Sequence, residues 1–258
     1  MATTVRTQAT KPPARRIPMD PTRKTALVAG IFYLITFVSI PTLALYGAVE
    51  NHRDWILSSG SRTGVLVGGF LEVIVALAGI GTAVTLYPVV KRQNEGFALG
   101  FVTSRVIEAG LIFTGVLSLL SLVTLRQDPG GTSGATAASL VTTAASHIAI
   151  YKWTFVLGQN LMPGVNALLL GTLMYRSRLV PRVIPVLGLI AGPLLIASVV
   201  ATMFGGIKLG SPIAAGLPVA AWELSLGVWL TVKGFRPAPI TAGMEAASSP
   251  PAYHDVTV

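Results

Sequence analysis

Two residues of opposite charge interrupt a long apolar run of the chain. The run extends from residue 97 to residue 125, and Arg105 and Glu108 lie near its middle. On a helix, side chains three residues apart share a face and can pair. A charge at the centre of a membrane-spanning helix costs about 2.5–3.5 kcal/mol on insertion scales, so it should face a protein interior and a partner. The pair therefore predicts a helical bundle around this segment.

Other polar residues lie at a similar depth in neighbouring apolar runs. They are Glu72 in the run 64–89, Gln159 and Asn160 in the run 153–175, and Glu223 in the run 213–232. We predict that they meet Arg105 and Glu108 in one buried cluster of three carboxylates and a single guanidinium. Because negative charge would exceed positive charge in a low-dielectric interior, such a cluster favours binding of a proton or another cation. These six residues are therefore our candidates for binding or ion coupling.

The same residues also allow a purely structural interpretation. Arg–Glu pairs cross-link neighbouring helices, and a protonated glutamate can donate a hydrogen bond much as a glutamine does. For Arg105 and Glu108 both interpretations stay open. For Glu72 and Glu223 the sequence offers no basic partner, which favours a functional role.

The composition indicates a membrane protein. Hydrophobic residues make up 52% of the 258-residue chain and charged residues 11%, whereas about 25% charged residues is usual in soluble domains. The apolar residues form long uncharged runs rather than amphipathic patterns. We therefore predict an all-α fold, a polytopic bundle of six transmembrane helices at about residues 25–46, 64–89, 97–125, 153–175, 183–204 and 213–232.

The basic residues predict how the bundle is oriented. Of the 19 Lys and Arg residues, thirteen fall in segments that six spans place on one side, five fall on the other side, and Arg105 lies between. Cytoplasmic loops are enriched in Lys and Arg, so both termini are predicted to be cytoplasmic. Membrane orientation thus explains the net charge of +9, and no nucleic-acid partner is expected.

The segments outside the spans are predicted to be tails or loops. Residues 1–22, which are basic and proline-rich, and residues 237–258 are expected to be disordered cytoplasmic tails. The Gly/Thr/Ser/Ala-rich stretch up to about residue 146 is expected to be a loop or a short helix at the membrane interface.

Within the predicted spans, several residues suggest local geometry. Pro41 and Pro163 predict bends, and the spacing of Gly64 and Gly68 favours a close helix contact. Lys152, Gln159 and Asn166 recur every seven residues, which places them on one face of a helix.

Several classes of protein have no support in the sequence. The chain contains no cysteine, which excludes disulfides, thiol catalysis and cysteine-ligated metal sites. The zinc-protease, nucleophile-elbow, P-loop and dinucleotide-binding motifs are not found. We therefore expect no enzyme activity, no cofactor and no metal site.

Four segments resemble a known family. They are RKTALVAGIFYLITF, LYPVVKRQNEGFALGFVTSRVIEA, LLLGTLMYRSRLVPRVIPVLGLIAGPLL and WELSLGVWLTVKGF. The chain from about Arg23 to Arg236 is similar to the bacterial integral-membrane family catalogued as domain of unknown function 4386. The resemblance implies a multi-pass protein of the bacterial cytoplasmic (inner) membrane, and it implies no activity. Residues at positions typical of the family pattern are Arg105, Glu108, Arg176, Arg178, Pro181, Arg182 and Glu223.

Three functions remain as hypotheses. The first is a small transporter or channel-like protein in which the buried carboxylates bind a proton or cation. The second is a non-catalytic sensor, assembly partner or lipid-binding scaffold, and the third is a membrane enzyme that modifies lipids. The expected partners are the lipid bilayer and an unknown small molecule or ion, with a second copy of the chain or another membrane protein as an open alternative.

Overall fold

All regular structure in the described part of the chain is helical. The computed structural model describes residues 19–52, 54–127, 136–209 and 213–246. Its elements are α1 (Pro21–Ile35), η1 (Thr36–Ser39), α2 (Thr42–Leu45), α3 (Gly47–Asn51), η2 (Trp55–Leu57), α4 (Thr63–Val90), α5 (Glu95–Gln127), α6 (Ala137–Val156), η3 (Leu157–Leu161), α7 (Met162–Ser177), α8 (Val183–Met203), α9 (Ile213–Val232) and α10 (Pro239–Ala246). The predicted all-α class is confirmed.

Three helices are long and apolar enough to cross a membrane. They are α4, α5 and α8, and residues Gly216–Val232 of α9 form a shorter apolar helix. The 33 residues of α5 extend about 50 Å at 1.5 Å per residue. That length exceeds the bilayer's hydrocarbon core of about 30 Å, so α5 can cross a membrane and continue beyond it.

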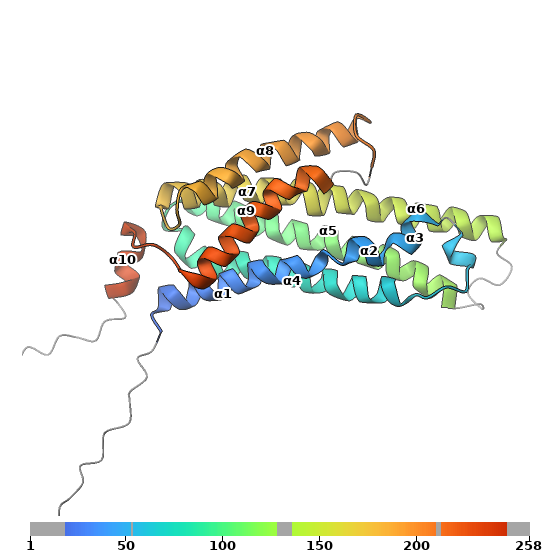
Figure 1. Ribbon diagram of the computed structural model, residues 1–258, viewed down its shortest axis with the longest axis horizontal. Helices are drawn as coiled ribbons and strands as arrows, with labels where there is room; N and C mark the ends of the chain where they lie inside the picture. The colour runs from blue at the N-terminus through green and yellow to red at the C-terminus, as the bar shows by residue number, and fades with distance from the viewer. Residues whose placement is uncertain (1–18, 53, 128–135, 210–212, 247–258) are drawn as a thin grey trace, which may run out of the picture.

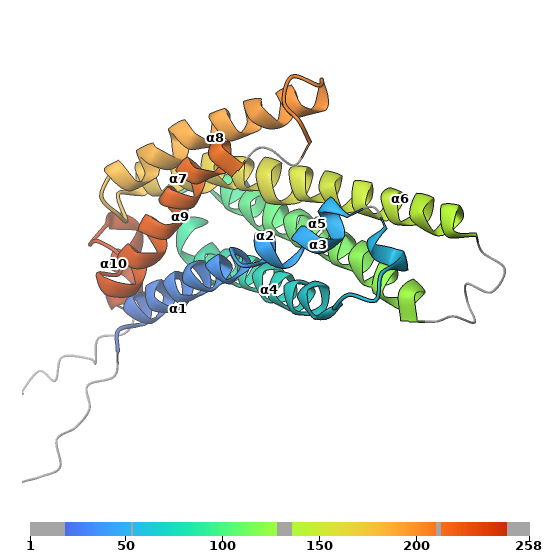
Figure 2. The ribbon, with the colours of Figure 1, turned by 45° about the vertical axis from the view of Figure 1, so that its right-hand side comes forward.

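The helices pack around two main groups of buried side chains, one toward each end of the molecule. In Figure 1, α1, α8, α9 and α10 lie toward the left end, whereas α2, α3 and the long helix α6 lie toward the right end. The larger core joins buried residues of α1, α4, α5, α7, α8 and α9. The second core joins the α2–α3 junction, η2 and α6 with the first turn of α4 and the C-terminal part of α5. Figure 2 shows α4, α5 and α6 running alongside one another into that second region.

The first predicted span, residues 25–46, is not one continuous helix. Helix α1 ends at Ile35 and gives way to the 3₁₀ turn η1 and then, after Pro41, to the short helix α2. Proline lacks an N–H, so Pro41 cannot donate to the helical hydrogen-bond ladder. The hydroxyls of Thr36 and Thr42 each donate to the carbonyl three residues earlier, at 2.6 Å, which also favours a tighter turn.

The polar stretch before the predicted fourth span is helical rather than a loop from Ala137 onward. Helix α6 begins after Thr136, whose hydroxyl accepts a hydrogen bond from the N–H of Ser139 at 3.2 Å. The hydroxyls of Thr142 and Thr143 donate to carbonyls four residues earlier, each at 3.0 Å. These bonds satisfy the hydroxyls within the helix, so a polar sequence extends α6 well beyond the predicted span. Residues 128–135 lie outside the described part of the chain.

The predicted C-terminal tail contains a helix. Helix α10 packs against α1, with Ala238 and Ile240 against the larger core. Arg92 donates to the carbonyl of Ile240 at 3.3 Å. The expectation of disorder across residues 237–258 is therefore wrong for α10. The segment is proline-rich, but its apolar residues pack against the larger core and so order the helix. Of the predicted N-terminal tail, Pro21 and Thr22 form the start of α1. Residues 1–18 and 247–258 lie outside the described residues.

Arg23 ties the first helix to the last long one. Its guanidinium donates to the carbonyls of Leu230 at 2.9 Å and Thr231 at 2.6 Å, in the last turn of α9. The final carbonyls of a helix have no partners within it, and the dipole there favours a cation. Arg23 therefore caps α9 while it holds α1 and α9 side by side.

Candidate functional site

An ion-paired group of three residues joins α5 and α9. Arg105 is 2% exposed, and one of its terminal nitrogens lies 3.1 and 3.0 Å from the two carboxylate oxygens of Glu108. The other terminal nitrogen lies 2.6 Å from Glu223 Oε1. The predicted pairing of Arg105 with Glu108 is confirmed, and Glu223 joins it on the same guanidinium. We call Arg105, Glu108 and Glu223 the triad.

Helices on both sides fix the position of the triad. From α7, Asn166 donates to Glu108 Oε2 at 2.7 Å. From α1, the ring of Tyr33 lies 5.5 Å from the Arg105 guanidinium, at cation–π distance. On α4, a Cβ added at Gly79 would lie 3.8 Å from the terminal nitrogen of Arg105. The triad is therefore the point at which α1, α4, α5, α7 and α9 are held together.

The triad contains more negative than positive charge. Two carboxylates share one guanidinium, so the fully ionised group has one excess negative charge. An unbalanced charge in a buried site is costly unless a proton, a cation or hydrogen-bond donors offset it. The triad is therefore suited to take up a positively charged species.

Glu72 lies in a separate site. Three donors converge on its carboxylate: Tyr46 Oη at 3.3 Å, Tyr151 Oη at 3.4 Å and Gln159 Nε2 at 3.1 Å. Glu72 is 1% exposed, and no described Lys or Arg forms an ion pair with it. We call this group, Glu72 with its three donors, the tyrosine site.

The prediction of one cluster is corrected by this division. The sequence position of a residue on a helix gives its depth, because each residue adds 1.5 Å. It does not give the rotation of each helix about its axis. The three carboxylates are therefore distributed over two sites, with Arg105 bonded to Glu108 and Glu223 and with Glu72 bonded to neutral donors.

A close contact between α4 and α2 supports the tyrosine site. A Cβ added at Gly64 would lie 2.6 Å from the carbonyl oxygen of Leu45, and one added at Gly68 would lie 2.8 Å from Tyr46 Cζ. The close approach expected from Gly64 and Gly68 is confirmed. It lets the Tyr46 ring lie against the α4 backbone and reach Glu72.

We expect loss of the tyrosine hydroxyls to destabilise the fold modestly. Tyr46→Phe and Tyr151→Phe each remove one hydrogen bond to Glu72 and should lower the free energy of unfolding by about 1 kcal/mol. Thermal unfolding in detergent measures the change. Tyr175→Phe is the matched control, since Tyr175 is 36% exposed. If both buried variants unfold at the same temperature as Tyr175→Phe, the hydroxyls of Tyr46 and Tyr151 do not stabilise the fold through Glu72.

A π-helical turn brings two amides into the interior. The turn η3 comes directly before α7, and Pro163 is one of the first residues of α7. Such turns are rare and occur frequently at functional sites. Gln159 donates to Glu72, and Asn160 donates to the carbonyl of Phe155 at 3.3 Å. The extra residue in the turn shifts the helical phase, so Gln159 reaches the tyrosine site while Asn166, seven residues later, reaches the triad.

A cavity of about 310 Å³ extends to the triad. Its walls come from η1, α4, α5, α6, η3, α7, α8 and α9. They include five of the six predicted site residues: Arg105, Glu108, Gln159, Asn160 and Glu223. Ile40 and Leu217, which also line it, are 61% and 63% exposed. The cavity therefore leads from the surface of the molecule to the triad, and Gln159 connects it with the tyrosine site.

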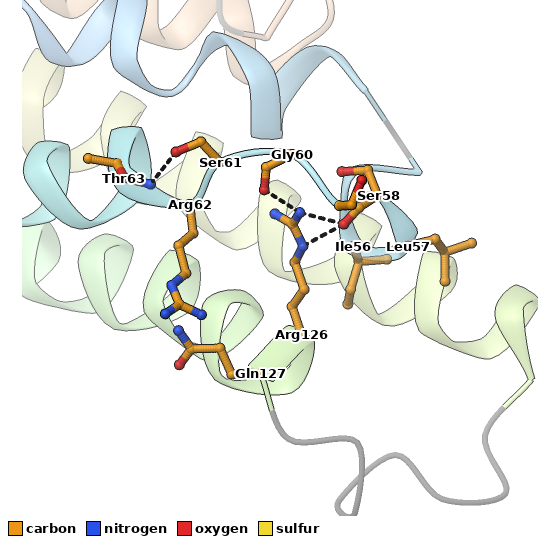
Figure 3. Close-up of a pocket in the computed structure, with 10 residues that line it drawn as sticks. Ile56, Leu57, Ser58, Gly60, Ser61, Arg62, Thr63, Arg126 and Gln127 are labelled. Atoms are coloured by element: carbon orange, nitrogen blue, oxygen red, sulfur yellow. Dashed lines mark hydrogen bonds between the residues drawn. The ribbon is translucent and has the colours of Figure 1, made fainter.

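A second cavity, of about 540 Å³, lies in the loop before α4. Figure 3 shows Arg126, from the end of α5, donating to the carbonyls of Ser58 and Gly60. The guanidinium also lies 4.3 Å from the centroid of the Trp55 ring. These contacts fix the loop on α5, and none of the predicted site residues lies there.

Glu50 of α3 lies outside the predicted spans, at the end of the molecule that holds the tyrosine site. Burial raises the pKa of its carboxyl, and the nearby charge of Lys152 lowers it in part. The end of the bundle that holds the tyrosine site thus contains a second carboxyl in partly apolar surroundings.

Sequence reasoning did not identify four residues of these sites as candidates: Tyr33, Tyr46, Tyr151 and Asn166. Asn166 carried a signal, because it is a polar residue inside an apolar run. The tyrosines carried none, since tyrosine is common near membrane interfaces and in apolar cores. Only the packing of α1, of the α2–α3 junction and of α6 within the bundle makes them partners of buried charges.

Comparison with known proteins identifies a family but no characterised relative. No curated protein and no solved structure matches this chain. One family model, described as "Domain of unknown function (DUF4386)", matches residues 28–234. That range includes the triad, the tyrosine site and the cavity. Because the match covers more than half of the sequence, the chain belongs to the DUF4386 family, as its sequence motifs predicted.

Proposed function

We propose that this protein crosses the bacterial cytoplasmic membrane six times, with both termini in the cytoplasm. The positions of the basic residues support this orientation. Arg23 contacts the end of α9, Arg92 contacts α10, and the N–H of Arg236 donates to the carbonyl of Leu179 at 2.7 Å. Four basic segments predicted to be cytoplasmic thus converge at one end, where the positive-inside rule would place them.

We infer that its function is transport linked to a proton or small cation. The observation that carries this proposal is the cavity that leads to a triad with one excess carboxylate. Intramembrane ionisable groups that face a cavity commonly mark an ion or substrate pathway. Glu223 is the residue expected to take up the cation. Its side chain is 13% exposed, and no described donor contacts its Oε2.

A flux assay tests the proposal. Purified protein is reconstituted in liposomes that contain a dye sensitive to pH, to Na⁺ or to K⁺, and flux of each ion is followed under an imposed gradient of that ion. We expect wild-type protein to carry at least one of these ions. Glu223→Gln should reduce that flux to the level of protein-free liposomes. The matched control is Glu95→Gln, which changes an exposed carboxylate at the start of α5 and should leave the flux unchanged.

The same assay separates the alternatives. Folded wild-type protein without flux in any gradient would exclude transport of these ions and favour a sensor, assembly partner or lipid-binding scaffold. Flux that survives Glu223→Gln would place the pathway elsewhere. Turnover of a lipid in the same liposomes would favour the lipid-modifying enzyme.

A further inference from the structure

The polar side chains that line the cavity at the triad present hydrogen-bond acceptors rather than free donors. Gln159 Nε2 donates to Glu72, and the amide oxygen of Gln159 takes no part in that bond. Asn160 Nδ2 is occupied by the carbonyl of Phe155. Each amide nitrogen lies against an acceptor, so the orientation of both amides follows from their partners. Asn160 is only 4% exposed, and no described donor reaches its Oδ1.

The charged donor of the cavity is also occupied. Both terminal nitrogens of Arg105 bond to carboxylates. Its Nε has no hydrogen-bond partner among the described residues, but it is fully buried and so is not presented to the cavity. Among the hydroxyls of the wall, Thr36 donates to Tyr33 O at 2.6 Å and Ser39 donates to Thr36 O at 3.1 Å. A bound molecule would therefore meet oxygen acceptors, including the Oε2 atom of Glu223, together with one excess negative charge.

Most of the remaining wall is apolar. Val75, Leu195 and Val219 contribute aliphatic surface, and Phe37 and Phe155 contribute aromatic rings. A volume of about 310 Å³ lies within the range of small-molecule sites, about 300–1,000 Å³. A hydrated metal ion would leave this apolar surface without a partner, whereas an organic body would cover it.

Backbone N–H groups at the start of α9 lie near the mouth and would favour negative charge there. The effect of a helix end fades within its first turn. Glu223 lies seven residues beyond Gly216 in the sequence, about 10 Å along the helix. The charge preference at the triad is therefore set by its carboxylates.

We propose that this cavity binds a primary or secondary organic ammonium ion with an apolar body. Its N–H groups would donate to Glu223 Oε2 and Asn160 Oδ1, and its apolar part would lie against Phe37, Phe155 and Val219. The inference rests on the proposed transport function only in treating the cavity as the substrate site. It adds the substrate class, which the triad alone does not define.

A series of ligands with one body and different head groups tests this assignment. Purified wild-type protein in detergent is heated with 2-phenylethylammonium, its N-trimethyl derivative, 2-phenylethanol or 3-phenylpropanoate, and unfolding is followed by tryptophan fluorescence. The primary amine is charged at about pH 7, because its pKa is close to that of lysine. A ligand that binds only the folded protein raises Tm with its concentration.

We expect the primary ammonium to raise Tm, and the alcohol and the carboxylate to require at least about tenfold higher concentration for the same shift. The trimethyl derivative should be weaker than the primary ammonium, because it has charge but no N–H. Equal shifts from the alcohol or the carboxylate would overturn the proposal. So would a trimethyl derivative that binds more tightly than the primary ammonium.

Two variants locate the site. Glu223→Gln should abolish the ammonium-dependent shift. Ala220→Leu should do the same by filling the cavity, since Ala220 lines it and takes no part in the triad. Glu95→Gln is the control and should keep the full shift. If Glu223→Gln does not fold, Ala220→Leu and the ligand series still decide, and a full shift in Ala220→Leu would overturn the proposal.

The outcome can be separated from that of the flux assay. Ammonium binding at this site without any ion or amine flux would overturn transport and leave the ligand assignment in place. Flux of protons or metal cations, without binding of the ammonium probe, would overturn the ligand assignment and leave transport in place.

Discussion

Arg105→Gln should destabilise the protein more than any other single polar substitution in the bundle. In the wild type, Arg105 lies 3.0 Å from an oxygen of Glu108 and 2.6 Å from an oxygen of Glu223. The substitution leaves these two carboxylates with no guanidinium between them. Removal of one partner from a buried ion pair typically costs about 3–5 kcal/mol, because an uncompensated charge remains. Thermal unfolding in detergent should show a correspondingly large fall in Tm.

A variant with all three charges removed identifies the cause. Arg105→Gln combined with Glu108→Gln and Glu223→Gln has no net charge in the triad and retains hydrogen-bonding groups. We expect this triple variant to recover most of the lost stability, since neutral replacement of a buried ionic group is often well tolerated. It should still lack flux and ammonium binding. A triple variant as unstable as the single one would show that shape, rather than charge balance, makes Arg105 necessary.

Arg92→Gln provides the matched control for the single substitution. Arg92 is exposed, and its guanidinium makes one long hydrogen bond, 3.3 Å, to the backbone carbonyl of Ile240. The same change of residue type there should alter the free energy of unfolding by less than about 1 kcal/mol. Comparable effects at both positions would contradict the special role assigned to Arg105.

Gly30→Ala should force α1 away from α9. A Cβ at position 30 would lie 2.7 Å from the backbone nitrogen of Thr231 and 2.9 Å from the carbonyl oxygen of Gly227. Backbone atoms of a packed helix cannot turn aside as a flexible side chain can. Overpacking of this kind typically costs about 1–3 kcal/mol, and the movement of α9 would also carry Glu223 away from Arg105. Both Tm and ion flux should therefore fall.

Gly110→Ala is the control for that substitution. Gly110 is an exposed residue within α5, and an added Cβ meets nothing within 4 Å. Alanine is a better helix former than glycine by about 1 kcal/mol, so this variant should be as stable as the wild type or slightly more stable. If Gly30→Ala behaves in the same way, the close contact between α1 and α9 does not limit stability.

These two predictions concern different causes of stability. Arg105 acts through charge balance at one point, whereas Gly30 acts through the distance between α1 and α9, and α9 carries Glu223. Because Glu223 lies on α9 and Arg105 on α5, both substitutions should lower function together with stability. The ligand series distinguishes them: Gly30→Ala keeps every polar group of the cavity and should weaken ammonium binding rather than change the preference among head groups.

The amino-acid sequence determined the helical class, the bounds of the longest helices and the close pairing of Arg105 with Glu108. These features depend on neighbours in the sequence. Apolar runs define α4, α5 and α8, and a three-residue spacing on one helix places two side chains on one face without help from the rest of the chain. The family match follows from the same local segments.

Only the tertiary structure decided which distant polar groups meet. Sequence fixes how deep a residue lies along its helix, but the rotation of each helix depends on how its whole surface packs against its neighbours. That packing places Glu223 against Arg105, and it places Glu72 against Tyr46 and Tyr151. The π-turn η3, directly before α7, was likewise not predicted, and it directs Gln159 and Asn166 to different sites. Depth is a local property of a helix, whereas the partners of a buried charge are a property of the assembled bundle.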